Sequence, residues 1–201
     1  MKPSKTQQVL ELAVKTGLVH ARTLRDSGLT RQALYRLRDR GVLQQVGPGL
    51  FRAPQVEPTQ HQTLVEVCLR APRGVVCLLS ALRFHDIGTQ LPPEVWLALP
   101  LGAWQPRIAE WGVRFLHFSG DAYATGIEHH TVGGADVRVY GVAKTVADCF
   151  KFRNQIGLDV AMEALREAGR AKACTVDEIW RCARVCRVQR VMLPYLEAMN
   201  G

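Results

Sequence analysis

The stretch that decides the fold of the N-terminal region reads Leu29-Thr30-Arg31-Gln32-Ala33-Leu34-Tyr35-Arg36-Leu37-Arg38-Asp39-Arg40-Gly41. Its apolar residues Ala33, Leu34 and Leu37 recur at the spacing of one helix face, which predicts a helix over residues 31–40. Thr30 is a favourable N-cap residue, and Gly41 is of the type that commonly ends a helix. The other faces of this helix are polar and mostly basic.

Two shorter helices are predicted before this one. Residues 6–15 have an apolar stripe that Gly17 ends. Residues 18–20 lead from it into a short helix over residues 21–27. The tight turn Ser27-Gly28-Leu29 then connects this short helix to the next one, as in a helix-turn-helix.

A hairpin is predicted after the three helices. Residues 42–46 read as a strand, Gly47-Pro48-Gly49 as a turn and residues 50–52 as the returning strand. Three helices followed by a hairpin describe a winged helix-turn-helix. We therefore predict an α+β chain that begins with a winged helix-turn-helix domain over residues 1–55.

The charge of the chain is concentrated in this first domain. Of the formal net charge of +8, residues 1–55 carry +7, because they hold ten Lys and Arg against three Asp and Glu. The remaining residues carry only +1. A basic module on a nearly neutral body favours a polyanionic partner, and double-stranded DNA suits a winged helix.

The helix over residues 31–40 supplies most of the candidate DNA-binding residues. In a helix-turn-helix this helix enters the major groove, where Arg can read guanine and Gln can read adenine. The candidates that face bases or the groove are Thr30, Arg31, Gln32, Tyr35 and Arg36. The candidates for phosphate contacts are Arg38, Arg40 and, in the wing, Arg52. Two alternatives stay open: the winged helix contacts only proteins, or Tyr35 is a packing residue.

The rest of the chain predicts a second domain over residues 60–201, after a linker near residues 53–58 that contains two prolines. It is predicted to be a mixed α/β domain with a helical end. Strands are predicted at residues 94–99, 113–118 and 137–140. Helices are predicted at residues 63–69, 80–85, 142–152, 158–170, 176–185 and 188–199. Thr175, with Glu178 three residues later, predicts a capping box.

No motif in this second domain predicts catalysis. The chain has no P-loop, Rossmann or nucleophile-elbow sequence. The adjacent His129 and His130 would point to opposite faces of a strand, and Lys144 with Asp148 is better read as an ion pair one helical turn apart. Cysteine spacing gives no zinc or redox motif, although Cys182 and Cys186 would share a helix face. We predict no enzyme, no cofactor and no metal site.

Composition excludes several classes of protein. Hydrophobic residues make up 47% and charged residues 22% of the 201 residues, as in ordinary globular domains. The longest apolar runs, residues 75–79 and 95–99, are far shorter than the roughly 20 residues of a membrane span. No signal sequence precedes them, so we expect a cytoplasmic protein without a membrane partner.

Several segments together resemble the AbiEi family of antitoxins and transcriptional regulators, from bacterial abortive-infection (type IV toxin–antitoxin) systems. The likeness extends over nearly the whole chain, in order and spacing. The segments that carry it are residues 29–37, Gly47-Pro48-Gly49-Leu50-Phe51, Leu79-Ser80-Ala81-Leu82-Arg83-Phe84-His85, Val95-Trp96-Leu97-Ala98-Leu99-Pro100, Ala143-Lys144-Thr145-Val146-Ala147-Asp148-Cys149-Phe150 and residues 156–161.

The resemblance implies a repressor that binds inverted repeats upstream of its own operon through the winged helix. It also implies that the C-terminal domain is needed for antitoxicity toward a nucleotidyltransferase-type toxin, without direct binding between the two proteins.

Two other functions stay open. One is a stand-alone regulator whose C-terminal domain senses a ligand or protein. The other is an enzyme that acts on nucleic acid, in which Asp136 or Asp148 would serve a divalent metal.

Overall fold

The computed structural model describes residues 4–21, 24, 28–47, 49–54, 62–108, 112–132 and 135–200. These residues form an α+β protein with a helical C-terminal end, which confirms the predicted fold class. The chain divides into two compact units, Met1–Leu69 with His130–Val137, and Arg70–His129 with Arg138–Gly201. The predicted boundary at residues 55–60 lies outside the described residues, so the division into domains 1–55 and 60–201 stays a prediction.

The first unit contains the elements of a winged helix-turn-helix. In chain order these are α1 (Lys5–Thr16), β1 (Leu18–His20), α2 (Arg31–Asp39), β2 (Gln44–Gly47), β3 (Leu50–Arg52) and α3 (Gln62–Arg70). The helix α1 begins at Ser4, whose Oγ accepts a hydrogen bond from the backbone N–H of Gln7 at 3.2 Å. It ends at Gly17, whose φ of 76° is a conformation that glycine adopts without strain. Most of the predicted helix over residues 21–27 lies outside the described residues.

The strands of this unit form an antiparallel sheet in the order β1-β3-β2. Strand β1 is a correction to the sequence analysis, which treated residues 18–20 only as a connection. All three of its residues are buried, and Val19 pairs with Phe51 of β3. The pair β2–β3 is the predicted wing hairpin, although Pro48 of its turn lies outside the described residues.

One hydrophobic core holds α1, α2 and the sheet of this unit together. Leu34 of α2, Phe51 of β3 and Val9 of α1 are fully buried within it. Burying a side chain of this size stabilises the fold by about 1.5–3 kcal/mol. The apolar stripe predicted for α2 is therefore the face by which that helix is attached.

The second sheet has the strand order β6-β5-β4-β8-β7 and mixes parallel with antiparallel pairs. Its strands are β4 (Val75–Val76), β5 (Val95–Pro100), β6 (Val113–Phe118), β7 (Ile127–Val132) and β8 (Ala135–Tyr140). The strands predicted near residues 94–99, 113–118 and 137–140 are confirmed as β5, β6 and β8. The strands β4 and β7 were not predicted; β4 is two residues long, and β7 carries mostly polar side chains.

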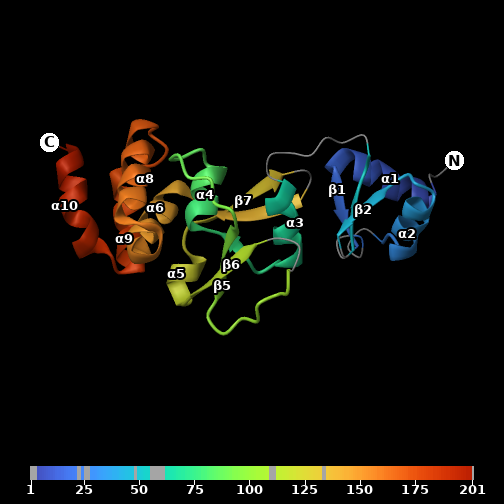
Figure 1. Ribbon diagram of the computed structural model, residues 1–201, viewed down its shortest axis with the longest axis horizontal. Helices are drawn as coiled ribbons and strands as arrows, with labels where there is room; N and C mark the ends of the chain where they lie inside the picture. Colours follow the sequence, from blue (N-terminus) through green and yellow to red (C-terminus); the bar gives the residue numbers. More distant parts are fainter. Residues whose placement is uncertain are drawn as a thin grey trace. The chain divides into compact units, whose positions relative to one another are not determined.

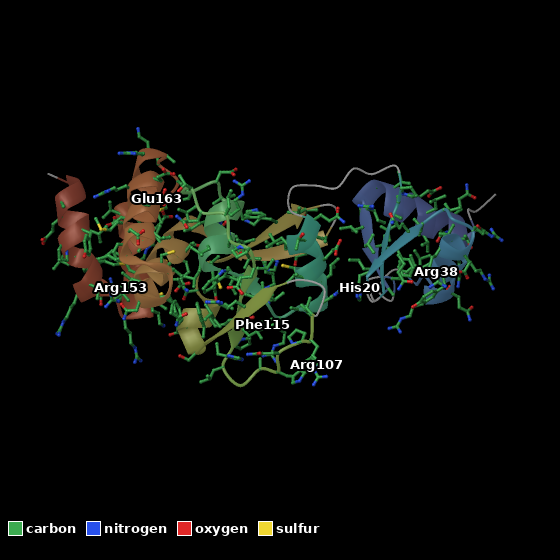
Figure 2. The ribbon with its side chains drawn as sticks, in the orientation of Figure 1. His20, Arg38, Arg107, Phe115, Arg153 and Glu163 are labelled. Atoms are coloured by element: carbon green, nitrogen blue, oxygen red, sulfur yellow. The ribbon has the colours of Figure 1, made fainter. Side chains whose placement is uncertain are left out.

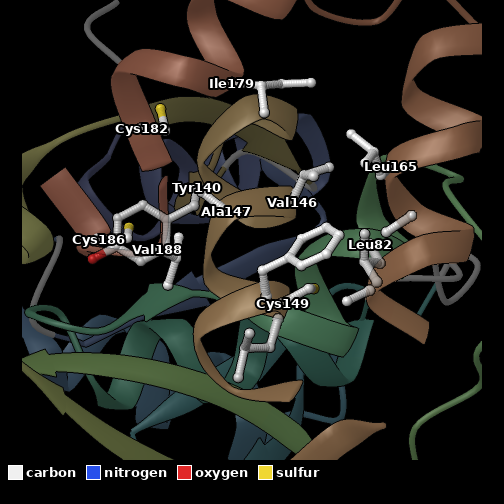
Figure 3. Close-up of a cluster of buried hydrophobic side chains, with 14 of the residues drawn as sticks. Leu82, Tyr140, Val146, Ala147, Cys149, Leu165, Ile179, Cys182, Cys186 and Val188 are labelled. Atoms are coloured by element: carbon white, nitrogen blue, oxygen red, sulfur yellow. The ribbon is translucent and has the colours of Figure 1, made fainter. Parts of the chain in front are cut away.

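The C-terminal helices lie side by side in Figure 1, and most of them contact α6 (Val142–Lys151). The helices of this part are α4 (Leu78–Phe84), α5 (Gly120–Ala124), α6 (Val142–Lys151), α7 (Arg153–Ile156), α8 (Leu158–Arg170), α9 (Val176–Cys186) and α10 (Gln189–Asn200). Val146, Ala147 and Cys149 of α6 are fully buried against Leu82, Leu165 and neighbours from the other helices (Figure 3). The short helices α5 and α7 were not predicted.

A buried ion pair lies inside this core. The Lys144 Nζ is 2.5 Å from the Asp148 Oδ2, and both side chains are completely buried. The ammonium also lies 4.1 Å from the ring centroid of Tyr140, and the Cys186 thiol donates to Asp148 Oδ1 at 3.2 Å. The sequence predicted this pair from its helical spacing, but did not predict its burial.

The capping box predicted at Thr175 is present. The Thr175 Oγ1 accepts from the backbone N–H of Glu178 at 3.2 Å, and the Thr175 N–H donates to Glu178 Oε2 at 2.7 Å. These bonds satisfy two backbone donors that the helix itself cannot pair.

We expect Thr175→Ala to lower the free energy of unfolding by about 1 kcal/mol, because the first turn of α9 loses its cap. Thermal or denaturant unfolding measures this loss. The Thr175→Ser variant is the control, because it retains the hydroxyl and should remain close to the unmodified protein. Equal losses in the two variants would contradict the capping role.

None of the helices in the described ranges is both long and apolar enough to cross a membrane.

Candidate nucleic-acid interface

Helix α2 separates its side chains sharply between a buried and an exposed face. Ala33, Leu34 and Leu37 are buried, as its apolar stripe predicted. Arg31, Gln32, Arg36 and Arg40 are exposed, and within the described part of the chain none of them has a hydrogen-bonded or ionic side-chain partner. Thr30 occupies the N-cap position, with no hydrogen bond from its side chain to the helix. The N-terminal half of α2 therefore presents unengaged donors to solvent.

Tyr35 both packs and remains accessible. Its ring meets Phe51 edge-on, with centroids 5.4 Å apart, while 37% of the residue is exposed. The guanidinium of Arg38 lies over this ring, 4.8 Å from the centroid. Because Phe51 belongs to β3, Tyr35 connects α2 to the wing sheet, which agrees with the packing role that the sequence analysis left open.

Arg38 of α2 (Figure 2) is held by its neighbours rather than free in solvent. Its Nε and Nη2 donate to Asp39 Oδ1 at 2.9 and 2.7 Å, and its Nη1 donates to Gln45 Oε1 at 2.8 Å. Gln45 lies on β2, so this bond links the helix to the wing. The side chain of Arg38 is nevertheless 38% exposed.

Arg52 is placed differently from the other candidates. It is half-buried at the end of β3, where Nη2 donates to Gln44 Oε1 at 2.9 Å and Nη1 donates to Gln62 Oε1 at 3.3 Å. Gln62 in turn donates to Glu66 Oε1 at 2.8 Å, so a chain of hydrogen bonds joins the wing to α3. Arg52 is thus a bridge within this unit, and its role toward phosphate stays a prediction.

Apart from Thr30 at the N-cap of α2, the candidates therefore form two groups. The first group is exposed and unengaged, and consists of Arg31, Gln32, Arg36 and Arg40. In the second group Tyr35, Arg38 and Arg52 are tied to the wing. The glutamines Gln44 and Gln45, which hold the two arginines, were missed in the sequence analysis. The only signal in the sequence was the presence of two consecutive polar residues in a predicted strand. It could not identify their partners, because Arg38 and Arg52 lie on other elements.

Turn geometry supports a helix-turn-helix reading of this region. Gly28, before α2, and Gly41, after it, have φ of 67° and 70°, in the left-handed region that favours glycine. A Cβ at either position would meet no atom within 4 Å, so backbone conformation alone selects glycine there. Ser27 of the predicted turn lies outside the described residues.

The side chains that could bind a metal or react as thiols lie in surroundings that favour a structural role. In the described ranges no three His, Cys, Asp or Glu side chains lie together as a metal-binding group. The six cysteines are free thiols, and five of them are buried. Burial raises the pKa of the Cys186 thiol to about 12, with the nearby Asp148 carboxylate adding to the rise, so this sulfur remains a protonated thiol at neutral pH.

We expect Arg52→Ala to weaken binding to all DNA sequences by a similar factor, and to lower the slope of log affinity against log salt by about one. Titrations of a specific and a shuffled DNA fragment at several salt concentrations measure both quantities. Unchanged affinity with lower thermal stability would show instead that Arg52 serves only the bridge to Gln44 and Gln62. Arg166→Ala is the matched control, because Arg166 is an exposed arginine on α8.

Comparison with known proteins finds a family model that is similar to this region. Residues 7–54 match the family model described as "Transcriptional regulator, AbiEi antitoxin". The match confirms the resemblance over the winged helix, and it covers the candidate residues from Thr30 to Arg52. No curated protein matches the chain. The resemblance of the remaining residues stays a prediction.

Proposed function

We propose that the protein is a transcriptional repressor that binds double-stranded DNA at inverted repeats upstream of its own operon. The single observation that carries this proposal is the exposed, unengaged set Arg31, Gln32 and Arg36 on α2, beside a hairpin, in a segment that matches AbiEi regulators. A protein with this activity acts in the cytoplasm, where bacterial DNA lies.

The two ends of α2 would have different roles in DNA binding. Its N-terminal residues Thr30, Arg31 and Gln32 would approach base edges in the major groove, with Arg36 one turn later. Arginine donates two parallel hydrogen bonds to guanine, and glutamine pairs in the same manner with adenine. Arg38 and Arg40, at the C-terminal end, would contact phosphates, which fix register without reading sequence.

We also infer the antitoxin role, as part of a type IV system with a nucleotidyltransferase-type toxin. The description of the matched family supports antitoxin activity in general. The C-terminal residues 60–201 would supply it, without direct binding between antitoxin and toxin. Co-expression of the toxin gene with the full chain, and with a variant that has lost DNA binding, separates this role from repression. Rescue of growth by both proteins supports it, and failure of both contradicts it.

The decisive experiment for the repressor role is a binding titration on about 150 base pairs upstream of the gene. A shuffled fragment and two salt concentrations serve as controls. Binding to the native fragment that survives salt sufficient to release the shuffled one supports the proposal. Equal, salt-labile binding to both fragments would contradict the proposal, because it would show only a general attraction between a basic surface and a polyanion.

A stand-alone regulator that senses a ligand is the second candidate. It is favoured by a half-open pocket of about 280 Å³ in the second unit, near the lower limit for small-ligand sites. The pocket lies between the start of α6 and α9, and Lys144, Arg181 and Cys182 line it. A small molecule that raises the unfolding temperature and changes operator affinity would support this candidate. An adjacent nucleotidyltransferase gene would favour the antitoxin.

A further inference from the structure

Strand β2 of the wing places two consecutive glutamines next to two arginines of other elements. Gln45 Oε1 accepts a hydrogen bond from Arg38 of α2 at 2.8 Å, and its Nε2 donates to the Gly47 carbonyl at 3.2 Å. Gln44 instead accepts from Arg52 of β3 at 2.9 Å. Both glutamines are exposed, so neither contributes to the core of the unit. Their contacts serve the orientation of the arginines.

The guanidinium of Arg38 is fixed on three sides. Asp39 takes one edge through Nε and Nη2, Gln45 takes Nη1, and the ring of Tyr35 lies against the plane. Arginine has five N–H donors, so two remain without a partner among the described residues. These two donors belong to Nη1 and Nη2, and the exposed 38% of the side chain leaves room for an acceptor.

We propose that Gln45 is a positioning residue for DNA binding: it holds Arg38 in the orientation in which its two remaining N–H groups meet a phosphate of the DNA backbone. This proposal rests on the proposed repressor function. Gln45 acts through Arg38, and is not among the DNA-binding residues predicted from the sequence.

Pre-organisation is the physical reason for such a role. A free arginine side chain loses rotamer freedom when it is fixed, and this loss normally opposes binding. A side chain already fixed in the unbound protein loses less on binding. Asp39 offsets much of the charge of Arg38, so the attraction for DNA as a polyanion is reduced at this point. What Arg38 contributes is a phosphate contact at a defined position, which fixes the register of α2 on the DNA.

A double-mutant cycle tests the proposal. Gln45→Ala is expected to lower affinity for the upstream fragment about three- to tenfold, the equivalent of one hydrogen bond. In an Arg38→Ala background the same substitution should have no further effect, because the group that it positions is absent. The matched control is Gln44→Ala, whose partner is Arg52, and whose effect should be the same with or without Arg38.

A second measurement does not depend on DNA. The Nη1 resonance of Arg38, the nitrogen that donates to Gln45, should be distinct and slow to exchange in the unmodified protein. It should exchange rapidly in Gln45→Ala, while the Nε–H that donates to Asp39 and the unfolding temperature change little. If the protein binds no DNA but this resonance behaves as expected, the repressor function fails while the positioning of Arg38 by Gln45 stands. Equal losses from Gln45→Ala in both backgrounds, or an unchanged resonance, would overturn the proposal.

Discussion

Lys144→Met should lower the free energy of unfolding by about 3–5 kcal/mol, because it leaves the Asp148 carboxylate buried without its cation. Both side chains of the pair are completely buried, and the ammonium also packs on Tyr140. A loss of this size is a large part of the stability of an ordinary domain. Denaturant titration with a spectroscopic readout measures it, and Lys172→Met, at an exposed position, is the control that should change little.

The deficit should depend on pH in a defined direction. Burial raises the pKa of Asp148 above its ordinary value, and Lys144 opposes the rise, so its removal raises the pKa further. A carboxyl with a higher pKa in the folded state binds its proton more tightly there, so stability falls as pH rises between the unfolded and the folded value. The deficit of Lys144→Met relative to the unmodified protein should therefore be smallest near about pH 4 and grow toward neutrality.

A double variant separates charge from packing. Replacing both partners by apolar residues, Lys144→Met with Asp148→Leu, removes the unpaired charge, and its stability should return close to that of the unmodified protein. If the double variant is as unstable as Lys144→Met alone, the packing around α6 requires these two side chains for their shape. In that case the argument from the unpaired charge is wrong.

Arg31→Ala and Arg36→Ala should each lose about 1–3 kcal/mol of binding free energy on the operator, which is about 5- to 150-fold in affinity. The reason is that both side chains are exposed on α2 without partners, where they can donate to a base edge. Titration of the native and shuffled upstream fragments measures the effect. The loss should be confined to the native fragment if the arginine reads a base.

The same variants can show a different role for each arginine. Equal loss on native and shuffled DNA would assign that side chain to a phosphate. Because neither residue contacts the core, the unfolding temperature should remain unchanged, and Arg166→Ala on α8 should leave binding unaffected. Loss of binding together with loss of folding would contradict the separation between the two faces of α2.

The sequence predicted α2 well because the apolar stripe and the basic exposed residues both lie within this one helix. Ala33, Leu34 and Leu37 are spaced by the helix itself, so local periodicity is sufficient to identify the buried face. The strands β5, β6 and β8 were found for the same reason, since each has apolar residues in a run or in alternation. The family match over residues 7–54 includes α2 but none of these three strands.

What could not be predicted depends on contacts between distant segments. Strand β1 is only three residues long and is a strand because it pairs with β3, about thirty residues later. Gln44 and Gln45 become part of the candidate interface only because β2 lies beside Arg52 and Arg38. The pair Lys144–Asp148 was predicted, but its burial results from the enclosure of α6 by α4, α8 and α9.

The sharp division of α2 into an attached and an unattached face has a consequence for how such a regulator diverges. Substitutions at Arg31, Gln32 and Arg36 change no buried contact, whereas those at Leu34 and Leu37 do. Under the proposed repressor function, duplicated copies of this gene can therefore acquire new operators through surface changes that leave folding intact. Several such systems could then coexist in one genome without regulating each other's promoters.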